Sequence, residues 1–575
     1  MRLKPLFFIF IILCSATPAG AFDYLPVQSA AEAIESPKIK SCREMKTLHI
    51  PMRTSGAHVV ALDANGYELK TAPGSLFAKR GLDVALELKN SIVSQLKDYM
   101  NCKSPIMCGT QGMLNAVADL TEADQRTQMV AIYQHGWSNG DSALVARPGI
   151  QSPADLSGAK IITQAFGPHL EYLGRIISDA RQSVQESGGQ WQTPEILLTQ
   201  DLVGFQEQTP GKAFYEDNTA DAAFVLMPDA QILTSRAEVG TGAEGSVKGA
   251  QILVSTKSAS RVMSEIYVVR KDYFEAHRGQ IREFVEAMLK AEEKTRENAI
   301  KLLVEWDAVG KHLLNDAGAT EAAKNLWGNF ETVGLRGNAE WAEKEHPRSF
   351  LSVNNKIQDF FVKLGLMRQA YAFAMADWDF AALSGGLFDQ RRADLPGFDD
   401  NQTTRVVQDL KNQGELDKKT LIDFDIQFKP NQHTFPIAQY EEKFNKVIDL
   451  AATYGGAVLT VEGHSDPLNF LKKKAGGAPS HQLRSIQQAA RNLSINRAIK
   501  VRDTIIDFAR QKSITLDESQ FVVLGHGISE PKTGMCGGDP CPPKTESEWL
   551  SNMRVNFRIV QVEAESSVFT PPNTW

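Results

Sequence analysis

A polar segment at residues 386–420 most constrains how this chain folds. The surrounding sequence, LSGGLFDQRRADLPGFDDNQTTRVVQDLKNQGELDKK, is rich in Gly, Asp, Asn and Gln and poor in apolar residues. This composition is typical of a linker, here with one short helix. A chain of 575 residues is too long for one hydrophobic core. We therefore predict two folded units, residues 46–385 and 421–565, on either side of the linker.

Strand and helix signals alternate along the longer unit. MVAIYQ at 129–134 and EIYVVRKDYF at 265–274 are typical of buried strands, and GQIREFVEAMLKAEEKTRENAIKLLVEW at 279–306 is typical of an amphipathic helix. Strands separated by helices at this spacing predict an α/β fold with largely parallel sheets. We expect paired α/β lobes, as in a hinged binding protein that holds its ligand between them.

The shorter unit carries a different order of elements. Ile422, Phe424 and Ile426 alternate with polar residues, as do residues 555–559 in the last strand, and both patterns indicate half-buried strands. The order β-α-β-α-β-β predicts a small two-layer α/β domain.

The N-terminus reads MRLKPLFFIFIILCSATPAGAFDY, with a short positive region, a short apolar run and small residues before Phe22. This pattern predicts a signal peptide at residues 1–21 and export to the periplasm. A membrane anchor is the weaker interpretation because a span needs about 20 apolar residues. A lipoprotein site at Cys14 is weaker still. The net charge of −7 argues against nucleic acid as the main partner.

Export makes disulfides the expected use of the remaining cysteines. Cys536 and Cys541 are spaced as a small loop staple. Cys42, Cys102 and Cys108 leave one odd thiol, and the sequence does not say which. No histidine cluster accompanies these cysteines, so we predict no metal site.

In the shorter unit an acid and a base frame a candidate site. Asp466 follows a strand, where α/β sheets place ligands, and Arg497 lies on the next packed helix. One interpretation is a plain salt bridge between them. The other is a clasp for a zwitterion, in which Asp466 accepts from an ammonium and Arg497 grips a carboxylate.

Four motifs bear on this choice: VEGHSD at 461–466, LSINRAIKV at 493–501, GHGISEP at 525–531 and NMRV at 552–555. Together they resemble the OmpA-like peptidoglycan-binding family. The resemblance implies that Asp466 and Arg497 clasp the diaminopimelate of the wall peptide, with Asn552 and Arg554 at the same site. Ser465 replaces the family's threonine, Ala490 its asparagine, and the stretch after Asp466 is longer and carries three lysines, residues 472–474.

In the longer unit, strand-to-helix loops should line the cleft, because their N–H groups suit anions. Each loop taken alone is more often an ordinary cap or turn. The phrases LFAKRGLDV at 76–84, LVARPGIQSPADLSG at 144–158, FGPHLEY at 166–172 and DAAFV at 221–225 resemble substrate-binding proteins of ABC transporters for nitrate, sulfonates and thiamine precursors. The resemblance implies a type II periplasmic-binding-protein fold. The candidate ligand contacts are Thr54, Ser55, Gly109, Thr110, Ser138, Asn139, Gly167, His169 and Asp221.

These features predict an exported solute receptor anchored non-covalently to peptidoglycan. We expect it to serve uptake of a small anionic or heterocyclic solute, with an ABC permease as a further partner. The alternative is a structural or sensory envelope protein whose lobes bind a solute without transport. No phosphate-binding, nucleophile-elbow or zinc-protease motif is present in the sequence, so we predict neither enzymatic activity nor a cofactor.

Overall fold

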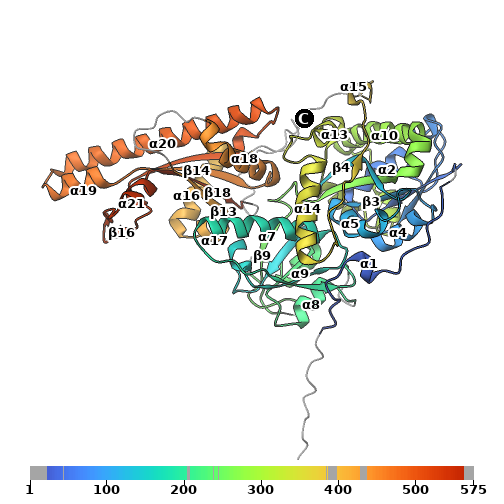
Figure 1. Ribbon diagram of the computed structural model, residues 1–575, viewed down its shortest axis with the longest axis horizontal. Helices are drawn as coiled ribbons and strands as arrows, with labels where there is room; N and C mark the ends of the chain where they lie inside the picture. Colours follow the sequence, from blue (N-terminus) through green and yellow to red (C-terminus); the bar gives the residue numbers. More distant parts are fainter. Residues whose placement is uncertain are drawn as a thin grey trace, which may run out of the picture.

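The computed structural model describes residues 22–42, 44–203, 207–236, 239–243, 245–383, 385, 387, 398–427 and 437–562. The predicted signal peptide lies outside these residues. Figure 1 shows a two-lobed body on one side and a smaller domain, coloured orange to red, on the other. The predicted α/β fold class, two lobes followed by a small α/β domain, is confirmed.

The first lobe holds a five-stranded sheet of order β11-β4-β10-β3, with β12 beside β4, and a parallel β1-β2 pair. Strand β10 runs antiparallel to both its neighbours, so the sheet is mixed rather than largely parallel. Apolar residues of α2 and α10 pack on these strands in one core. The main elements are β1 (Leu48–Met52), β2 (Val84–Leu88), β3 (Ile106–Thr110), β4 (Met129–Ser138), β10 (Ser264–Arg270), β11 (Phe330–Thr332), β12 (Ala374–Met375), α2 (Val59–Ala64), α4 (Ile92–Met100), α5 (Gln111–Ala116) and α10 (Lys271–Ile300).

The second lobe is inserted between β4 and β10, so the chain crosses between lobes twice. Its five strands have the order β7-β6-β8-β5-β9. Strand β5, the first strand after the first crossing, is antiparallel to its neighbours β8 and β9. Strand β6 is parallel to β7 and β8. Its elements are β5 (Ser142–Ala146), β6 (Lys160–Gln164), β7 (Glu195–Thr199), β8 (Ala222–Leu226), β9 (Gln251–Ser255), α7 (His169–Glu186), α8 (Pro210–Glu216) and α9 (Met227–Leu233).

Helix α14 (Phe350–Leu364) joins the two lobes. Figure 1 shows it in yellow between α5 of the first lobe and α7 of the second. Gln111 Nε2 donates to the Phe350 carbonyl at 2.9 Å, and Asn115 Nδ2 donates to Asn354 Oδ1 at 2.7 Å. On the other side, Gly174 of α7 lies against the ring of Phe360. One helix thus bridges both lobes.

The C-terminal domain has a four-stranded sheet of order β13-β18-β14-β15. The predicted alternation is confirmed, because Phe424 pairs with Phe557 in register and their rings stack at 5.3 Å. Apolar side chains of α18 and α20 cover one face of the sheet. The elements are β13 (Thr420–Gln427), α18 (Ile437–Thr453), β14 (Val458–His464), α19 (Leu468–Ala475), α20 (Ser480–Gln511), β15 (Phe521–Gly527), α21 (Glu546–Ser551) and β18 (Arg554–Val560).

Two helices, α16 (Asp400–Gln413) and α17 (Leu416–Lys419), lie within the expected linker. Val407 and Leu410, three residues apart on α16, pack on the second face of the C-terminal sheet with Val458 and Val560. This helix adds part of a third layer to the two that the sequence predicts. The domain bounds stay predictions, but ordered packing of the C-terminal unit begins before residue 421.

The cysteine pairing that the sequence left open is Cys42 with Cys102. The expected Cys536–Cys541 staple is confirmed. Cys108 is a free, buried thiol, and burial raises its pKa well above the ordinary range. Among the described residues, no helix is both long and apolar enough to cross a membrane.

The contact between α7 and α14 gives a stability prediction. A Cβ on Gly174 would lie 2.7 Å from Phe360 Cγ, so Gly174→Ala should destabilise the longer unit by about 1–3 kcal/mol through overpacking. Gly279→Ala on α10 is the matched control: no atom lies within 4 Å of its Cβ, so the helix should gain about 0.5–1 kcal/mol. Thermal unfolding measures both; a Tm that rises equally in the two variants would contradict the tight contact.

Candidate functional site

At the junction of the lobes, Glu265 of the protein itself accepts hydrogen bonds from groups that were expected to bind a solute. Glu265 on β10 accepts hydrogen bonds from Arg53 Nη1 at 3.0 Å and from the predicted contact Ser55 Oγ at 2.9 Å. His58 Nε2 lies 3.2 Å from the same carboxylate. Burial acts to raise the pKa of Glu265, but Arg53 and His58 outweigh it and hold the pKa well below the ordinary value. Glu265 therefore stays charged and neutralises the site.

A second carboxyl group, Glu171 of α7, crosses from the other lobe. Its Oε2 accepts from the Gly112 N–H of α5 at 2.9 Å, next to Thr110, which caps that helix. Burial raises the pKa of Glu171 to about 8, so the group is largely protonated at neutral pH. Its Oε1 is buried without a hydrogen-bond partner among the residues that the structure describes. Side chains from both lobes thus meet at this junction.

His169 and Ser138 belong to the same junction. His169 Nε2 lies 3.0 Å from Ser142 Oγ, and its ring stacks on Phe224. Burial lowers the pKa of His169 to about 3, so its imidazole is neutral. Ser138 Oγ donates to Asp141. This hydrogen bond directs the Ser138 side chain towards the bend between β4 and β5.

The other predicted contacts hold backbone in place. Thr54 Oγ1 donates to the Leu313 carbonyl at 2.9 Å, and Asp221 Oδ2 accepts from Lys160 N–H at 2.8 Å. Asn139 N–H donates to the Asn329 carbonyl, Gly109 pairs within β3, and Gly167 lies in the turn before α7. As ligand contacts all nine residues stay predictions.

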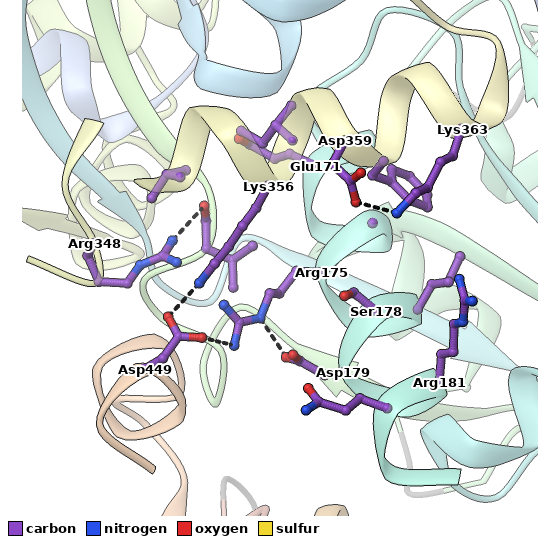
Figure 2. Close-up of a pocket in the computed structure, with 17 residues that line it drawn as sticks. Glu171, Arg175, Ser178, Asp179, Arg181, Arg348, Lys356, Asp359, Lys363 and Asp449 are labelled. Carbon is purple, nitrogen blue, oxygen red and sulfur yellow. Dashed lines mark hydrogen bonds and ion pairs between the residues drawn. The ribbon is translucent and has the colours of Figure 1, made fainter. Parts of the chain in front are cut away.

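A cavity of about 230 Å³ opens between α7, α14 and α18 of the C-terminal domain (Figure 2). Sequence reasoning missed it because its walls come from segments nearly 300 residues apart. Its lining residues are Glu171, Gly174, Arg175, Ile177, Ser178, Asp179, Arg181, Gln182, Val262, Arg348, Val353, Lys356, Ile357, Asp359, Phe360, Lys363 and Asp449.

Charged groups from three elements meet in this cavity. Arg175 donates through Nε to Asp179 at 2.6 Å, and its Nη2 lies 2.9 Å from Asp449. Lys356 Nζ donates to the other oxygen of Asp449 at 2.7 Å. Burial acts to raise the pKa of Asp449, but Arg175 and Lys356 outweigh it and lower that pKa. Figure 2 shows both cations pointing at Asp449.

Arg348 is a third cation in the wall of the cavity, beside Arg175 and Lys356. It is 5% exposed, and no salt bridge joins it to a carboxylate within the described part of the chain. Its Nη2 reaches only the Val262 carbonyl, at 3.5 Å, and its guanidinium lies over the Trp137 ring. Burial, followed by the charge of Arg175, lowers the pKa of Arg348 to about 10. Such a group stays charged at neutral pH and lacks a counter-ion.

In the C-terminal domain, Asp466 and Arg497 do not form the plain salt bridge considered above. Asp466 Oδ2 accepts from Leu468 N–H at 3.0 Å, while Oδ1 is buried and unpartnered among the described residues. Arg497 Nε is buried and likewise unpartnered, and within those residues no carboxylate lies at salt-bridge distance from it. Burial raises the pKa of Asp466 and lowers that of Arg497.

Asn552 and Arg554 are more engaged. The buried amide of Asn552 accepts from Thr533 N–H at 3.3 Å and holds the loop before the Cys536–Cys541 hairpin. Arg554 Nε lies 3.4 Å from Asp425, and Nη2 donates to the Glu530 carbonyl. Arg554 Nε and Nη1 are nevertheless buried without a hydrogen-bond partner among the described residues.

Glu462, His464 and His526 lie near enough to one another to hold a metal ion. Two cations already occupy the surroundings, since Lys411 Nζ lies 3.1 Å from His526 Nδ1 and Arg558 Nε lies 3.3 Å from Glu462. His526 itself donates to Glu462 at 2.9 Å. The charge of this cluster is therefore satisfied by the protein.

No protein-family model and no curated protein matches the sequence. Among solved structures, a putative periplasmic sulfonate-binding protein from Methylobacillus flagellatus shares 15% identity over 61% of this chain and 96% of its own, with a TM-score of 0.38. The aliphatic sulphonate-binding protein SsuA of Escherichia coli shares 13% identity over 58% and 95%, with a TM-score of 0.34. The desulfurization enzyme DSZB shares 15% identity over 60% and 99%, with a TM-score of 0.36.

These neighbours include periplasmic solute-binding proteins, but likenesses with such TM-scores carry no argument about this chain. The fold rests instead on its own sheet order. The absence of enzymatic activity stays a prediction.

The buried Glu171 gives a pH prediction. Its pKa is about 8 in the fold and about 4.3 in an unfolded chain, so the folded state binds the extra proton. Protonated Glu171 therefore stabilises the folded state. This contribution is complete below about pH 4 and is lost as the pH rises towards 8, and the free energy of unfolding falls by no more than about 1.4 kcal/mol per pH unit. In Glu171→Gln, which keeps the neutral form, Tm should fall less over this range than in the wild type. Parallel Tm curves would contradict the raised pKa.

Proposed function

We propose that the protein is an exported periplasmic receptor for a small anionic solute, held non-covalently to peptidoglycan by its C-terminal domain. One observation carries the anchoring: Arg497 is buried, Asp466 is half-buried with its Oδ1 atom buried, and the two opposite charges are not paired with each other. Unpaired buried charges cost free energy unless a ligand satisfies them. A zwitterion with a free ammonium and a free carboxylate satisfies both.

Contacts between β14 and α20 support this proposal. Gly463 of β14 lies against the Ser494 carbonyl of α20, where a Cβ would overlap it. One step further, Ser465 Oγ donates to the Ala490 carbonyl at 3.1 Å. Arg497 lies one turn beyond Ser494 on the buried face of α20, and Asp466 follows Ser465 directly. Gly463 thus allows β14 and α20, which carry the two parts of the proposed clasp, to pack closely.

The anchor lies where a wall polymer can reach it. Asp466 stands between β14 and α19, and Figure 1 shows α19, α21 and β16 (Met535–Cys536) at the end of the domain remote from the lobes. In the proposed clasp Asp466 accepts from the ammonium of diaminopimelate, and Arg497 donates two parallel hydrogen bonds to its carboxylate. The solute-binding body then stays near the membrane at raised effective concentration, where an ABC permease is its proposed partner.

The contacts of Glu171 and Glu265 at the junction of the lobes favour a second function, that of an envelope sensor without transport. Glu171 and Glu265 already satisfy the junction of the lobes, so a solute there is not needed for closure. Binding of a solute elsewhere would then be passed to an envelope partner rather than to a permease.

Co-sedimentation with purified peptidoglycan sacculi tests the anchor. The wild type should pellet, whereas Asp466→Ala and Arg497→Ala should stay in solution, with affinity lowered by at least tenfold, which is about 1.4 kcal/mol. Arg510→Ala is the matched control, because Arg510 is an exposed arginine of the same helix that pairs with Asp507 and Glu518. Added free diaminopimelate should release the wild type. Equal pelleting of all four proteins would refute the clasp.

A further inference from the structure

We infer that the solute site of this receptor is the cavity between α7, α14 and α18, and that it takes a small organic monoanion with a short apolar chain. This inference rests on the proposed receptor function and deepens it by assigning the site and the ligand class. It moves the site away from the cleft between the lobes, where the sequence predicts it.

Most donors of the cleft are already bound to the protein's own carboxyl groups, and Arg53 Nε is a buried donor that has no hydrogen-bond partner among the described residues. Arg53 and Ser55 are bound to Glu265, and the Gly112 N–H at the start of α5 is bound to Glu171. The backbone there is also close: a Cβ on Gly112 would lie 2.7 Å from Glu171 Cβ. Helix α14 then closes over α5 through Asn354 and Gln358, which both bond to Asn115.

Charge in the cavity selects one negative group. Its inner wall carries three cations, Arg175, Arg348 and Lys356, against two carboxylates, Asp179 and Asp449. Glu171 also lines the cavity, but burial raises its pKa to about 8, so this carboxyl is largely uncharged at neutral pH. One positive charge is therefore unbalanced, and it belongs to Arg348, the cation without a carboxylate.

The donors for this anion are already in place. Arg348 Nε and Arg175 Nη1 are both buried and lack hydrogen-bond partners among the residues described. Both residues line the cavity and are no more than 9% exposed. Planar guanidinium groups bind carboxylates and sulfonates through paired hydrogen bonds. An anion between them would satisfy two groups that now cost free energy.

Size and lining define the rest of the ligand. A volume of about 230 Å³ holds on the order of eight water molecules at ~30 Å³ each, which suits a small organic acid rather than an oligosaccharide. Apolar side chains also line the cavity, from Ile177, Val262, Val353, Ile357 and Phe360. The anionic head therefore faces the arginines and a short apolar chain faces α14.

The position of the cavity ties solute binding to the C-terminal domain. Asp449 of α18 forms part of the wall and holds Arg175 and Lys356 in place. A solute on Arg348 does not displace Asp449, because that carboxylate is bound to the other two cations. Solute binding should therefore stabilise the docked arrangement of the two units.

Isothermal titration calorimetry on the full mature chain at neutral pH tests the site. The probes are pentanoate and butane-1-sulfonate, with pentanamide as the neutral analogue and inorganic sulfate as the anion without a chain. We expect both organic anions to bind the wild type at least tenfold more tightly than either pentanamide or sulfate. Arg348→Gln, which removes the unpaired charge, and Val353→Phe, which narrows the apolar wall, should each weaken binding at least tenfold. Arg282→Gln, an exposed arginine of α10 paired with Glu286, should bind like the wild type.

Circular dichroism and pelleting on sacculi confirm that each variant is folded. If the organic anions bind the wild type, Arg348→Gln and Val353→Phe equally, the cavity is not the site, although the receptor function stands. If neither anion binds the wild type, or if pentanamide binds as tightly, the proposed ligand class is wrong. Pelleting on sacculi does not depend on Arg348, so failure of the cavity and failure of the anchor give separate results.

Discussion

Arg175 on α7 lies between two carboxylates that belong to different units of the protein. It bonds to Asp179 one turn away on its own helix and to Asp449 on α18 of the C-terminal domain. Lys356 of α14 completes the group on the other oxygen of Asp449. Removing one member of a buried ion group typically costs about 3–5 kcal/mol, since its partner is left uncompensated. Three structural elements are therefore held in one geometry.

Neutral contacts around this group reinforce the same arrangement. Tyr454 donates to Asp179 at 2.8 Å, and Ser183 of α7 donates to the Asp423 carbonyl of β13 at 3.0 Å. The second crossing between the lobes also takes part, because the Gly456 N–H donates to the Ser258 carbonyl. A domain docked on the crossing segment and on α14 restrains relative motion of the lobes. The proposed receptor thus combines two lobes in contact, a cavity at the domain junction and a proposed wall-binding site at the opposite end.

The sequence predicted what depends on short-range pattern. The alternation around Phe424 and Phe557 defined two strands that pair in register, and the motif ending at Asp466 placed an acid after a strand. The apolar residues Val407 and Leu410, at helical spacing inside a polar segment, were the available signal for α16. The cavity could not be found this way, because Arg175, Arg348 and Asp449 become neighbours only when three distant segments pack. Glu171 and Arg175, on the same face of α7 as its apolar residues, were a local sign that charges are buried there.

Small-angle X-ray scattering of the wild type and of Asp449→Lys tests the central claim, that this buried ion group docks the C-terminal domain on the lobes. Reversing the charge at 449 places three cations together and should release the domain. The account predicts a compact wild-type profile that fits the docked arrangement and a clearly larger radius of gyration for the variant. Identical profiles for the two proteins would contradict it.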